Sequence, residues 1–184
     1  MELLRWLKQN YIIYNCLQAG AVMGTGDFIA QKFVEKKEVL DTRRLATFAG
    51  LGTFFVGPIQ STWFRFLNSK VPFHWPPVQR GLVKMVVDQA TMAPTMVATV
   101  MSLLELRLGS GTLSGVKEEL QNKYPTIMGN GYKVWPAVQA LNFTFTPVQY
   151  QVLVTQLVGV AWNAYFSTAK NRHGLNYDQR KQGT

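Results

Sequence analysis

The sequence predicts an all-α integral membrane protein, a four-helix bundle with kinked helices and a short amphipathic interfacial helix between spans three and four. Two observations predict this class. Charged residues make up only 16 % of the 184 residues, against about 25 % in an average soluble domain. The charges are also segregated, since residues 9–26, 45–64, 89–104 and 134–169 carry none. A membrane-crossing helix needs about 20 mostly apolar residues, so we expect a single membrane domain over residues 1–184.

The expected spans are about residues 9–33, 45–67, 80–105 and 136–168. The second and fourth contain uncharged runs of full length, and the other two reach it when flanking charged side chains snorkel or face protein. The loop before the last span holds the amphipathic helix. Thr112 or Ser114 is its expected cap, and Val116 and Leu120 lie one turn apart. We expect this helix to lie along the membrane surface.

Small and polar residues form a stripe along the third span. Steps of three and four residues trace one face of a helix. From position 81 these steps give Gly81, Lys84, Asp88, Thr91, Thr95, Ala98, Ser102 and Glu105. The residues between them are mainly Val, Met, Leu and Ala, so the third span has one polar face.

The other spans carry similar stripes. In the last span the same steps give Gln139, Asn142, Thr146, Gln149, Leu153, Gln156, Val160, Asn163 and Ser167. The second span gives Ala46, Gly50, Thr53, Gly57 and Gln60, and the first gives Gly20, Gly24, Asp27 and Gln31. Two interpretations stay open. The stripes are either close-packed, hydrogen-bonded helix interfaces, or they face one another around a water-filled path.

Three prolines, Pro58, Pro94 and Pro147, lie inside apolar runs. Each removes a helix hydrogen bond and kinks or breaks the helix, which membranes tolerate where neighbouring groups satisfy the backbone. Such kinks give a bundle room to widen. The expected positions of close helix packing are Gly20, Gly24 and Gly57.

The net charge of +9 raises the question of nucleic acid. The cations lie in loops between uncharged runs, however, and not in one cluster interleaved with aromatics, so we expect no nucleic-acid contact. Basic loops beside spans more often face anionic lipid headgroups. Nine Lys and Arg fall on each side of the four expected spans, so the positive-inside rule assigns no orientation.

No catalytic, metal or cofactor motif stands out. Cys16 is the single cysteine, and His74 and His173 lie in a loop and a tail, so no metal site is expected. The stretch "GTGD" (24–27) lacks the later glycine of a dinucleotide fingerprint and ends a span instead of following a strand. We therefore expect a protein without enzymatic activity or cofactor.

Five pieces of the sequence point together to a family. They are "GTGDFIAQKFVE" (24–35), "FFVGPIQSTWFRFLNSKVP" (54–72), "KMVVDQATMAP" (84–94), "WPAVQALNF" (135–143) and "WNAYFS" (162–167). In this order and spacing they resemble the Mpv-seventeen/twenty-two-kilodalton peroxisomal membrane protein family, from about residue 6 to residue 170. The "FVGP" piece and the short loops are most similar to its mitochondrial inner-membrane member.

The resemblance implies four transmembrane helices, no catalytic chemistry and a weakly selective channel for small solutes. It also implies a place in the mitochondrial inner membrane, with the peroxisomal membrane as alternative, and a role in mitochondrial deoxynucleotide supply and DNA maintenance. The matching positions are Gly26, Asp27, Gln31, Gly57, Pro58, Trp63, Lys84, Asp88, Gln89, Pro94, Trp135, Pro136, Gln139, Asn142, Phe143, Pro147, Trp162 and Tyr165. The chain departs from many relatives at Ser61 (His), Phe64 (Tyr), Thr146 (Val) and Gln151 (Arg).

The leading hypothesis is a channel in which Lys84 and Asp88 form a charged constriction. Asp27 and Gln31 from the first span complete it, and a constriction with one charge of each sign predicts poor discrimination between cations and anions. The expected pore-lining or gating residues are Asp27, Gln31, Lys84, Asp88, Thr91, Thr95, Gln139, Asn142 and Asn163. The expected partners are membrane lipid and small solutes or ions, and a wide path would require a homo-oligomer or kinked helices. The alternative is a non-conducting membrane structural or assembly factor whose polar stripes only hold the helices together.

Overall fold

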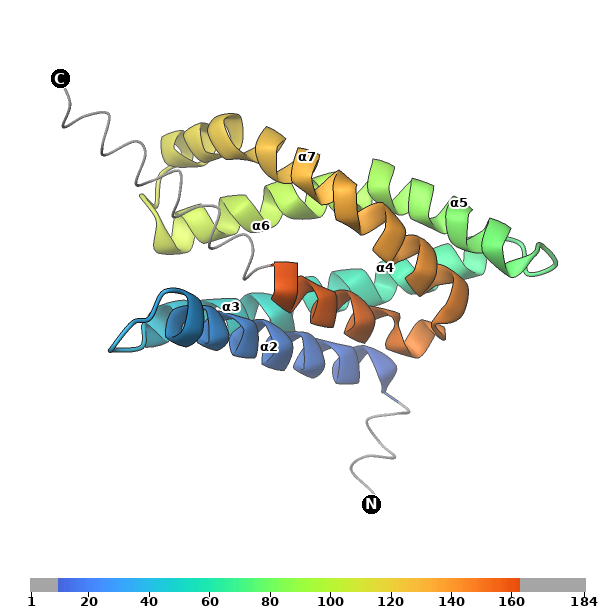
Figure 1. Cartoon of the computed structure of the whole chain (residues 1–184), viewed down its shortest axis with the longest axis horizontal. Coiled ribbons are helices and arrows are strands. Elements are labelled where there is room, and N and C mark those ends of the chain that lie inside the picture. The colour runs from blue at the N-terminus through green and yellow to red at the C-terminus, as the bar shows by residue number, and fades with distance from the viewer. Residues whose placement is uncertain (1–9, 163–184) are drawn as a thin grey trace, which may run out of the picture.

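Helices and short connections make up all of residues 10–162, the part of the chain that this computed structural model describes (Figure 1). The all-α prediction is confirmed. Among these residues no helix has both the length and the apolar character required to cross a membrane. The predicted membrane bundle is therefore confirmed only in its helical character.

The first two expected spans correspond to two nearly continuous helical segments. Helix α2 (Tyr11–Ile29) runs directly into the π-helical turn η1 (Ala30–Val34). Helix α3 (Thr42–Leu51), the π-turn η2 (Gly52–Val56) and α4 (Gly57–Lys70) follow one another without a break. The Asp41 side chain caps α3 by accepting a hydrogen bond of 2.9 Å from the Arg44 amide. Pro58 has no N–H to donate, and the widened turn η2 ends directly before Gly57 and Pro58, which lets the helix continue.

The third expected span is divided at Thr91 into α5 (Pro77–Ala90) and α6 (Met92–Leu108). Thr91 has non-helical torsion angles, φ −126° and ψ −67°. Pro94 explains the break, because it has no N–H for the carbonyl of Ala90 and its ring crowds that carbonyl. The side chains of α6 consequently do not continue the faces of α5.

The expected short interfacial helix does not exist as a separate element. Helix α7 (Leu113–Phe145) has 33 residues and runs through Pro125 and Pro136. Thr112 caps it, since its hydroxyl accepts a hydrogen bond of 3.1 Å from the Gly115 amide. The amphipathic segment thus continues without interruption into the start of the expected last span.

The last expected span, residues 136–168, is not one helix either. Helix α7 ends at Phe145, Thr146 is extended with φ −94° and ψ 127°, and a further helix begins at residue 148. Pro147 disfavours helical angles in the residue before it, so the chain turns back here. The new helix is described as far as residue 162.

The helices form two layers, which Figure 1 shows one above the other. Helix α2 packs along α3, η2 and α4, whereas α5 and α6 pack along α7. The helix of residues 148–162 joins the layers, because Val152 packs in a core cluster with Phe64, Leu67 and Phe143. Phe64 and Phe143 meet edge to face at 5.1 Å.

Glycines allow α2 to approach the second helical segment closely. A Cβ atom on Gly20 would clash with the Thr53 side chain and lie 2.9 Å from the Ala49 carbonyl oxygen. A Cβ on Gly57 would lie 2.7 Å from Cys16 Cα, and one on Gly24 would lie 3.3 Å from the Ala49 Cβ. Backbone contact at this distance requires glycine at positions 20 and 57.

Candidate functional site

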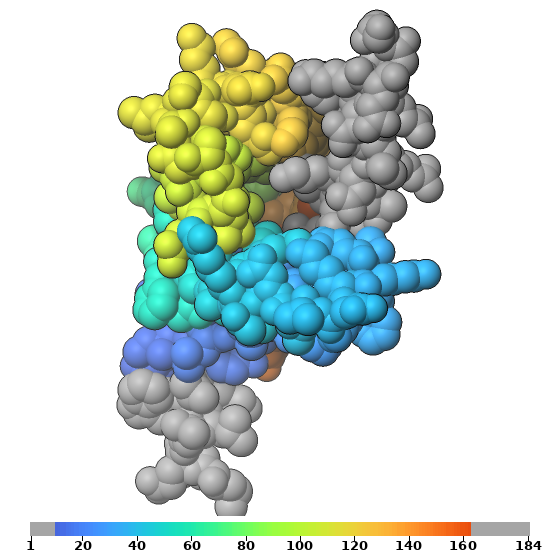
Figure 2. Space-filling view, turned by 90° about the vertical axis from the view of Figure 1, so that its left-hand side faces the viewer, coloured from blue at the N-terminus to red at the C-terminus, as the bar shows by residue number. Residues whose placement is uncertain are grey.

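A cavity of about 560 Å³ lies between the two layers. Its lining comes from α2, α3, α4, α5, α6, α7 and residues 148–162. The cavity reaches the protein surface at the end of α6, where Gly109 is exposed and belongs to the lining. Figure 2 looks onto this end and shows a recess between the α6–α7 connection and the segment near residues 35–45, with orange and red segments in its depth.

The lining combines acidic and flexible apolar side chains. Helix α6 contributes Met92, Ala93, Met96, Val97, Val100, Met101 and Leu104. The charged lining residues are Asp27, Glu35, Asp88, Glu105, Glu119 and Arg44. Carboxylates thus outnumber cationic groups in the described lining. They are spread along the cavity, and no group of His, Cys, Asp or Glu in residues 10–162 is close enough to hold a metal ion.

The buried carboxylate of Asp88 lines the cavity. Its Oδ1 accepts a hydrogen bond of 2.8 Å from Trp63 Nε1. Its Oδ2 accepts bonds of 3.0 Å from Gln89 Nε2 and 3.1 Å from Gln139 Nε2. Three N–H donors compensate for the water that the carboxylate has lost.

From Gln139 a chain of hydrogen bonds continues away from the cavity. Asn142 Nδ2 donates to Gln139 Oε1 at 3.2 Å and to Thr155 Oγ1 at 3.1 Å. It also donates to the carbonyl oxygen of Gln151 at 3.0 Å, and the side chain of Gln151 accepts a 3.0 Å bond from Asn68 Nδ2.

Lys84 ends the chain, since its Nζ donates to Asn68 Oδ1 at 2.5 Å. We call this set the polar plug: Lys84, Asn68, Gln151, Asn142, Thr155, Gln139 and Asp88. All but the half-buried Asn68 are buried. Of its members only Asp88, Gln139 and Thr155 line the cavity, and the other four lie outside its lining.

The structure gives Lys84 and Asp88, the two charges of the expected constriction, different partners. Within the described chain the two residues form no ion pair with each other, because Lys84 is held by Asn68 and Asp88 by three neutral donors. Lys84 and Asp88 lie one turn apart on α5, but their side chains bind different residues of the neighbouring helices. The charges therefore lie at the two ends of the polar plug.

Asp27 and Gln31 also lie elsewhere than expected. Asp27 Oδ1 forms an ion pair with Arg44 Nε at 2.7 Å, and Arg44 Nη1 forms a second with Glu35 at 2.8 Å. Gln31 Nε2 donates to Asp27 Oδ2 at 2.7 Å, and Gln31 Oε1 accepts from the Asp41 amide at 2.7 Å. Asp27 lines the same cavity as Asp88, but it belongs to a separate cluster with Arg44 and does not complete the constriction.

Thr91 and Thr95 do not line the cavity. Both are exposed, and their hydroxyls donate within the helix, to the carbonyls of Val87 (2.7 Å) and Thr91 (2.8 Å). The break at Thr91 is the reason, because it interrupts the predicted stripe and turns the Met92 and Met96 side of α6 to the cavity. Asn163 lies outside the described residues.

Several participating residues were not predicted as site residues. Gln156 Nε2 donates a hydrogen bond of 2.9 Å to Gln60 Oε1, and both residues line the cavity. Both also belong to the polar stripes of the sequence. Asn68 and Gln151 do not belong to the polar stripes, so the sequence pattern does not distinguish them from amide side chains on the surface. Only the tertiary fold identifies them as the bridge between Lys84 and Asn142.

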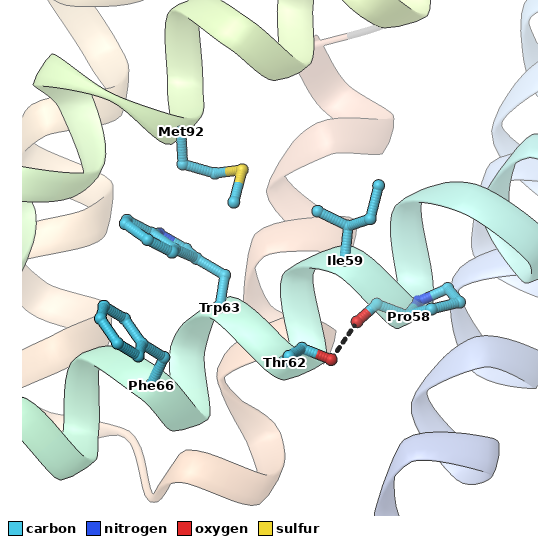
Figure 3. Close-up of a pocket in the computed structure, with 6 residues that line it drawn as sticks. All are labelled: Pro58, Ile59, Thr62, Trp63, Phe66 and Met92. Carbon is cyan, nitrogen blue, oxygen red and sulfur yellow. Dashed lines mark hydrogen bonds between the residues drawn. The ribbon is translucent and has the colours of Figure 1, made fainter.

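Trp63 connects the cavity-lining Asp88 to a second pocket, because its indole N–H bonds Asp88 and its ring lines that pocket. This second pocket has a volume of about 540 Å³ and is lined by Pro58, Ile59, Thr62, Trp63, Phe66 and Met92 (Figure 3). The Thr62 hydroxyl donates to the Pro58 carbonyl oxygen at 2.8 Å, which leaves a mainly apolar pocket. Met92 lines both this pocket and the cavity, so the two spaces lie on opposite sides of its side chain.

These features define a class of protein: a helical protein with an acidic internal cavity that opens at one end and borders a network of buried amides. The sequence profile of the Mpv17 / PMP22 family matches residues 107–167. Full-length relatives named "Mitochondrial inner membrane protein Mpv17" are similar over most of the chain. The Drosophila melanogaster relative is 38 % identical, over 84 % of this chain and 93 % of its own length.

The Bos taurus and Homo sapiens proteins of the same name are 36 % and 34 % identical, each over 85 % of this chain and 88 % of their own length. The chain belongs to the Mpv17 / PMP22 family. The expected localisation, the mitochondrial inner membrane, is confirmed by the names of these relatives. No solved structure matches the chain.

Proposed function

We propose that this protein is a weakly selective channel for ions or small metabolites in the mitochondrial inner membrane. The observation that carries the proposal is the cavity that opens beside Gly109 and meets the polar plug at Asp88, Gln139 and Thr155. A path that is open on one side and closed by side chains on the other matches a channel in its closed state.

The distribution of polar groups supports a bilayer-spanning arrangement. Among the largest fully buried side chains, Lys84, Gln31, Gln151, Asn15, Asn142 and Ser61 are polar. Large apolar side chains such as Phe54, Leu141 and Leu157 are exposed. Soluble monomers rarely expose many such groups, whereas membrane helices turn apolar groups outward and polar groups toward a cavity or partner.

The polar plug is suited to act as the gate. Its interior consists of amides and one hydroxyl joined by side-chain hydrogen bonds, so rotation of a few side chains is enough to interrupt it. Water that enters would replace each lost bond, and the net value of such a bond is only about 1 kcal/mol. A gate of this kind opens without repacking the helices.

The lining favours cations moderately. Arg44 is engaged by Asp27 and Glu35, and Asp88 faces only neutral donors. Carboxylates lining a path attract cations and repel anions, so polyanionic nucleotides fit this cavity poorly. We therefore propose that the implied role in deoxynucleotide supply and mitochondrial DNA maintenance acts through permeation of ions or small metabolites. The acidic lining, with its moderate preference for cations, replaces the expected charge-neutral constriction. The proposed activity is transport and not catalysis.

One observation favours the alternative, a non-conducting structural or assembly factor. The polar plug connects α4, α5, α7 and residues 148–162 through hydrogen bonds, as interhelical polar contacts in membrane proteins do. On this alternative, the cavity is a consequence of diverging helices and has no conducting role.

Current recordings separate the two functions. We expect purified full-length protein in planar bilayers under a KCl gradient to show discrete openings with a modest cation preference. Asp88→Asn should reduce that preference, because it removes the carboxylate at the gate. The matched control is Glu38→Gln, an exposed carboxylate that does not line the cavity, and it should behave like the wild type. A silent bilayer with folded, inserted protein would instead support the assembly factor.

A further inference from the structure

The two ends of the bundle differ in how their positive charges are compensated. Between Asp41 and Asp88 the sequence contains no acidic residue. The end formed by the last turns of α4, residues 71–76 and the first turn of α5 carries Arg65, Lys70 and Arg80. Within residues 10–162 none of the three forms an ion pair. The equal numbers of Lys and Arg on the two sides of the expected spans therefore do not mean equal compensation by carboxylates.

At the opposite end, three cations are paired with carboxylates in the described chain. Arg44 binds Asp27 and Glu35, and Lys37 lies 3.4 Å from Glu35. Lys123 pairs with Glu119 on α7. Attraction to a charged surface follows uncompensated charge. The end with Arg65, Lys70 and Arg80 therefore presents a positive surface, because residues 42–87 contain no Asp or Glu.

Each of these three cations lies over an aromatic ring. The guanidinium carbon of Arg80 lies 4.6 Å from the ring centre of Phe73. Arg65 lies 5.9 Å from Tyr11 on α2, and Lys70 Nζ lies 5.8 Å from the ring of Phe66. In addition, Arg80 Nε is buried without a hydrogen-bond partner in the described chain. The side chains of Arg65 and Lys70 are exposed and can donate to an external acceptor.

Apolar side chains surround the cations at the same end. Phe73 is 85 % exposed, and Phe66 and Val78 are 47 % and 57 % exposed. Trp75 lies in the same turn, between Pro72 and Pro76. Aromatic rings beside Lys and Arg are typical of the boundary between acyl chains and headgroups, and a phosphate groove for nucleic acid would not require exposed Phe73.

We propose that Arg65, Lys70 and Arg80 form a docking surface for anionic phospholipid headgroups, with Phe73 entering the acyl boundary. Phosphate oxygens accept hydrogen bonds from the two guanidinium groups and the ammonium group. The inference uses the membrane location of the proposed function but not conduction. A protein that binds lipid here and passes no current would fail the channel proposal alone.

The experiment measures retention of phosphatidylglycerol and of phosphatidylcholine by the full-length protein in neutral detergent, using native mass spectrometry and lipid-dependent thermal shifts. The test variant is Arg65→Gln/Lys70→Gln/Arg80→Gln. The control Lys36→Gln/Lys117→Gln/Lys133→Gln changes the net charge equally at exposed positions outside this surface. If the triple variant does not fold in the presence of phosphatidylcholine, the single variant Lys70→Gln is used as the test variant instead.

Each Lys or Arg near an anionic membrane surface contributes about 1 kcal/mol to the binding free energy, which corresponds to about a fivefold change in affinity. We expect Lys70→Gln to weaken phosphatidylglycerol binding about fivefold and the triple variant on the order of a hundredfold, with phosphatidylcholine binding and the control variant unchanged. Equal weakening by the control variant would overturn the proposal. Equally strong binding of free glycerophosphate or of heparin at this surface would also overturn it, because the site would then recognise anions and not a lipid surface.

Discussion

Trp63 Nε1 donates a hydrogen bond of 2.8 Å to Asp88 Oδ1, and this bond joins the lining of an outer apolar pocket to the lining of the cavity. The indole ring lines the outer apolar pocket with Met92 (Figure 3), whereas the carboxylate lines the cavity. Movement of the ring therefore changes the hydrogen bonding of the one carboxylate in the proposed gate.

Trp63→Phe should increase the open probability of the channel. The substitution keeps an aromatic ring but removes one of the three donors to Asp88, which costs the closed state about 1–2 kcal/mol. Where the closed state dominates, this corresponds to about a five- to thirtyfold rise in open probability in single-channel recordings. Phe66→Leu is the control, since Phe66 stacks on Trp63 at 5.7 Å but does not contact Asp88. If both variants raised the open probability equally, packing and not the hydrogen bond would set the gate.

Asn68→Leu should destabilise the protein because it leaves the buried ammonium of Lys84 without its acceptor. A hydrogen bond to a charged group is worth about 1.5–3 kcal/mol, so the thermal midpoint in detergent should fall clearly. Lys84→Met in the Asn68→Leu background should recover most of the loss, and the double-mutant cycle measures the coupling. Additive effects of the two substitutions would contradict the contact between Lys84 and Asn68.

Gly20→Ala should destabilise the contact between α2 and the α3–η2 segment by about 1–3 kcal/mol, because the new methyl group meets Thr53 and the Ala49 carbonyl. Gly50→Ala is the matched control on α3, where a Cβ meets nothing within 4 Å. That change should be neutral or stabilise the helix by up to about 1 kcal/mol. Thermal unfolding of both variants in one detergent compares them directly, and equal midpoints would contradict the close approach at Gly20.

The sequence predicts the helical class and the buried polar faces because helical periodicity is a local property. It places Asp88, Gln139 and Asn142 on inward faces, where the structure has them buried. It does not predict the partner of each group, because Asn68 and Gln151 reach Lys84 and Asn142 only through the packing of separate helices. The same limit explains why Thr91 and Thr95 are exposed and do not line the cavity, because a constant helical period does not hold across the break that Pro94 introduces.

We propose that the cavity beside Met96 is the conduction path, and cysteine substitutions at neighbouring positions on α6 test this directly. In a Cys16→Ala background, Met96→Cys puts a thiol in the lining, whereas Thr95→Cys puts one on the exposed side. The measurement is the change in single-channel current on adding a positively charged thiol reagent. We expect rapid block of Met96→Cys, slower block by a negatively charged reagent, and no block of Thr95→Cys. Block of Thr95→Cys with an unaffected Met96→Cys would contradict the assignment of the cavity as the path.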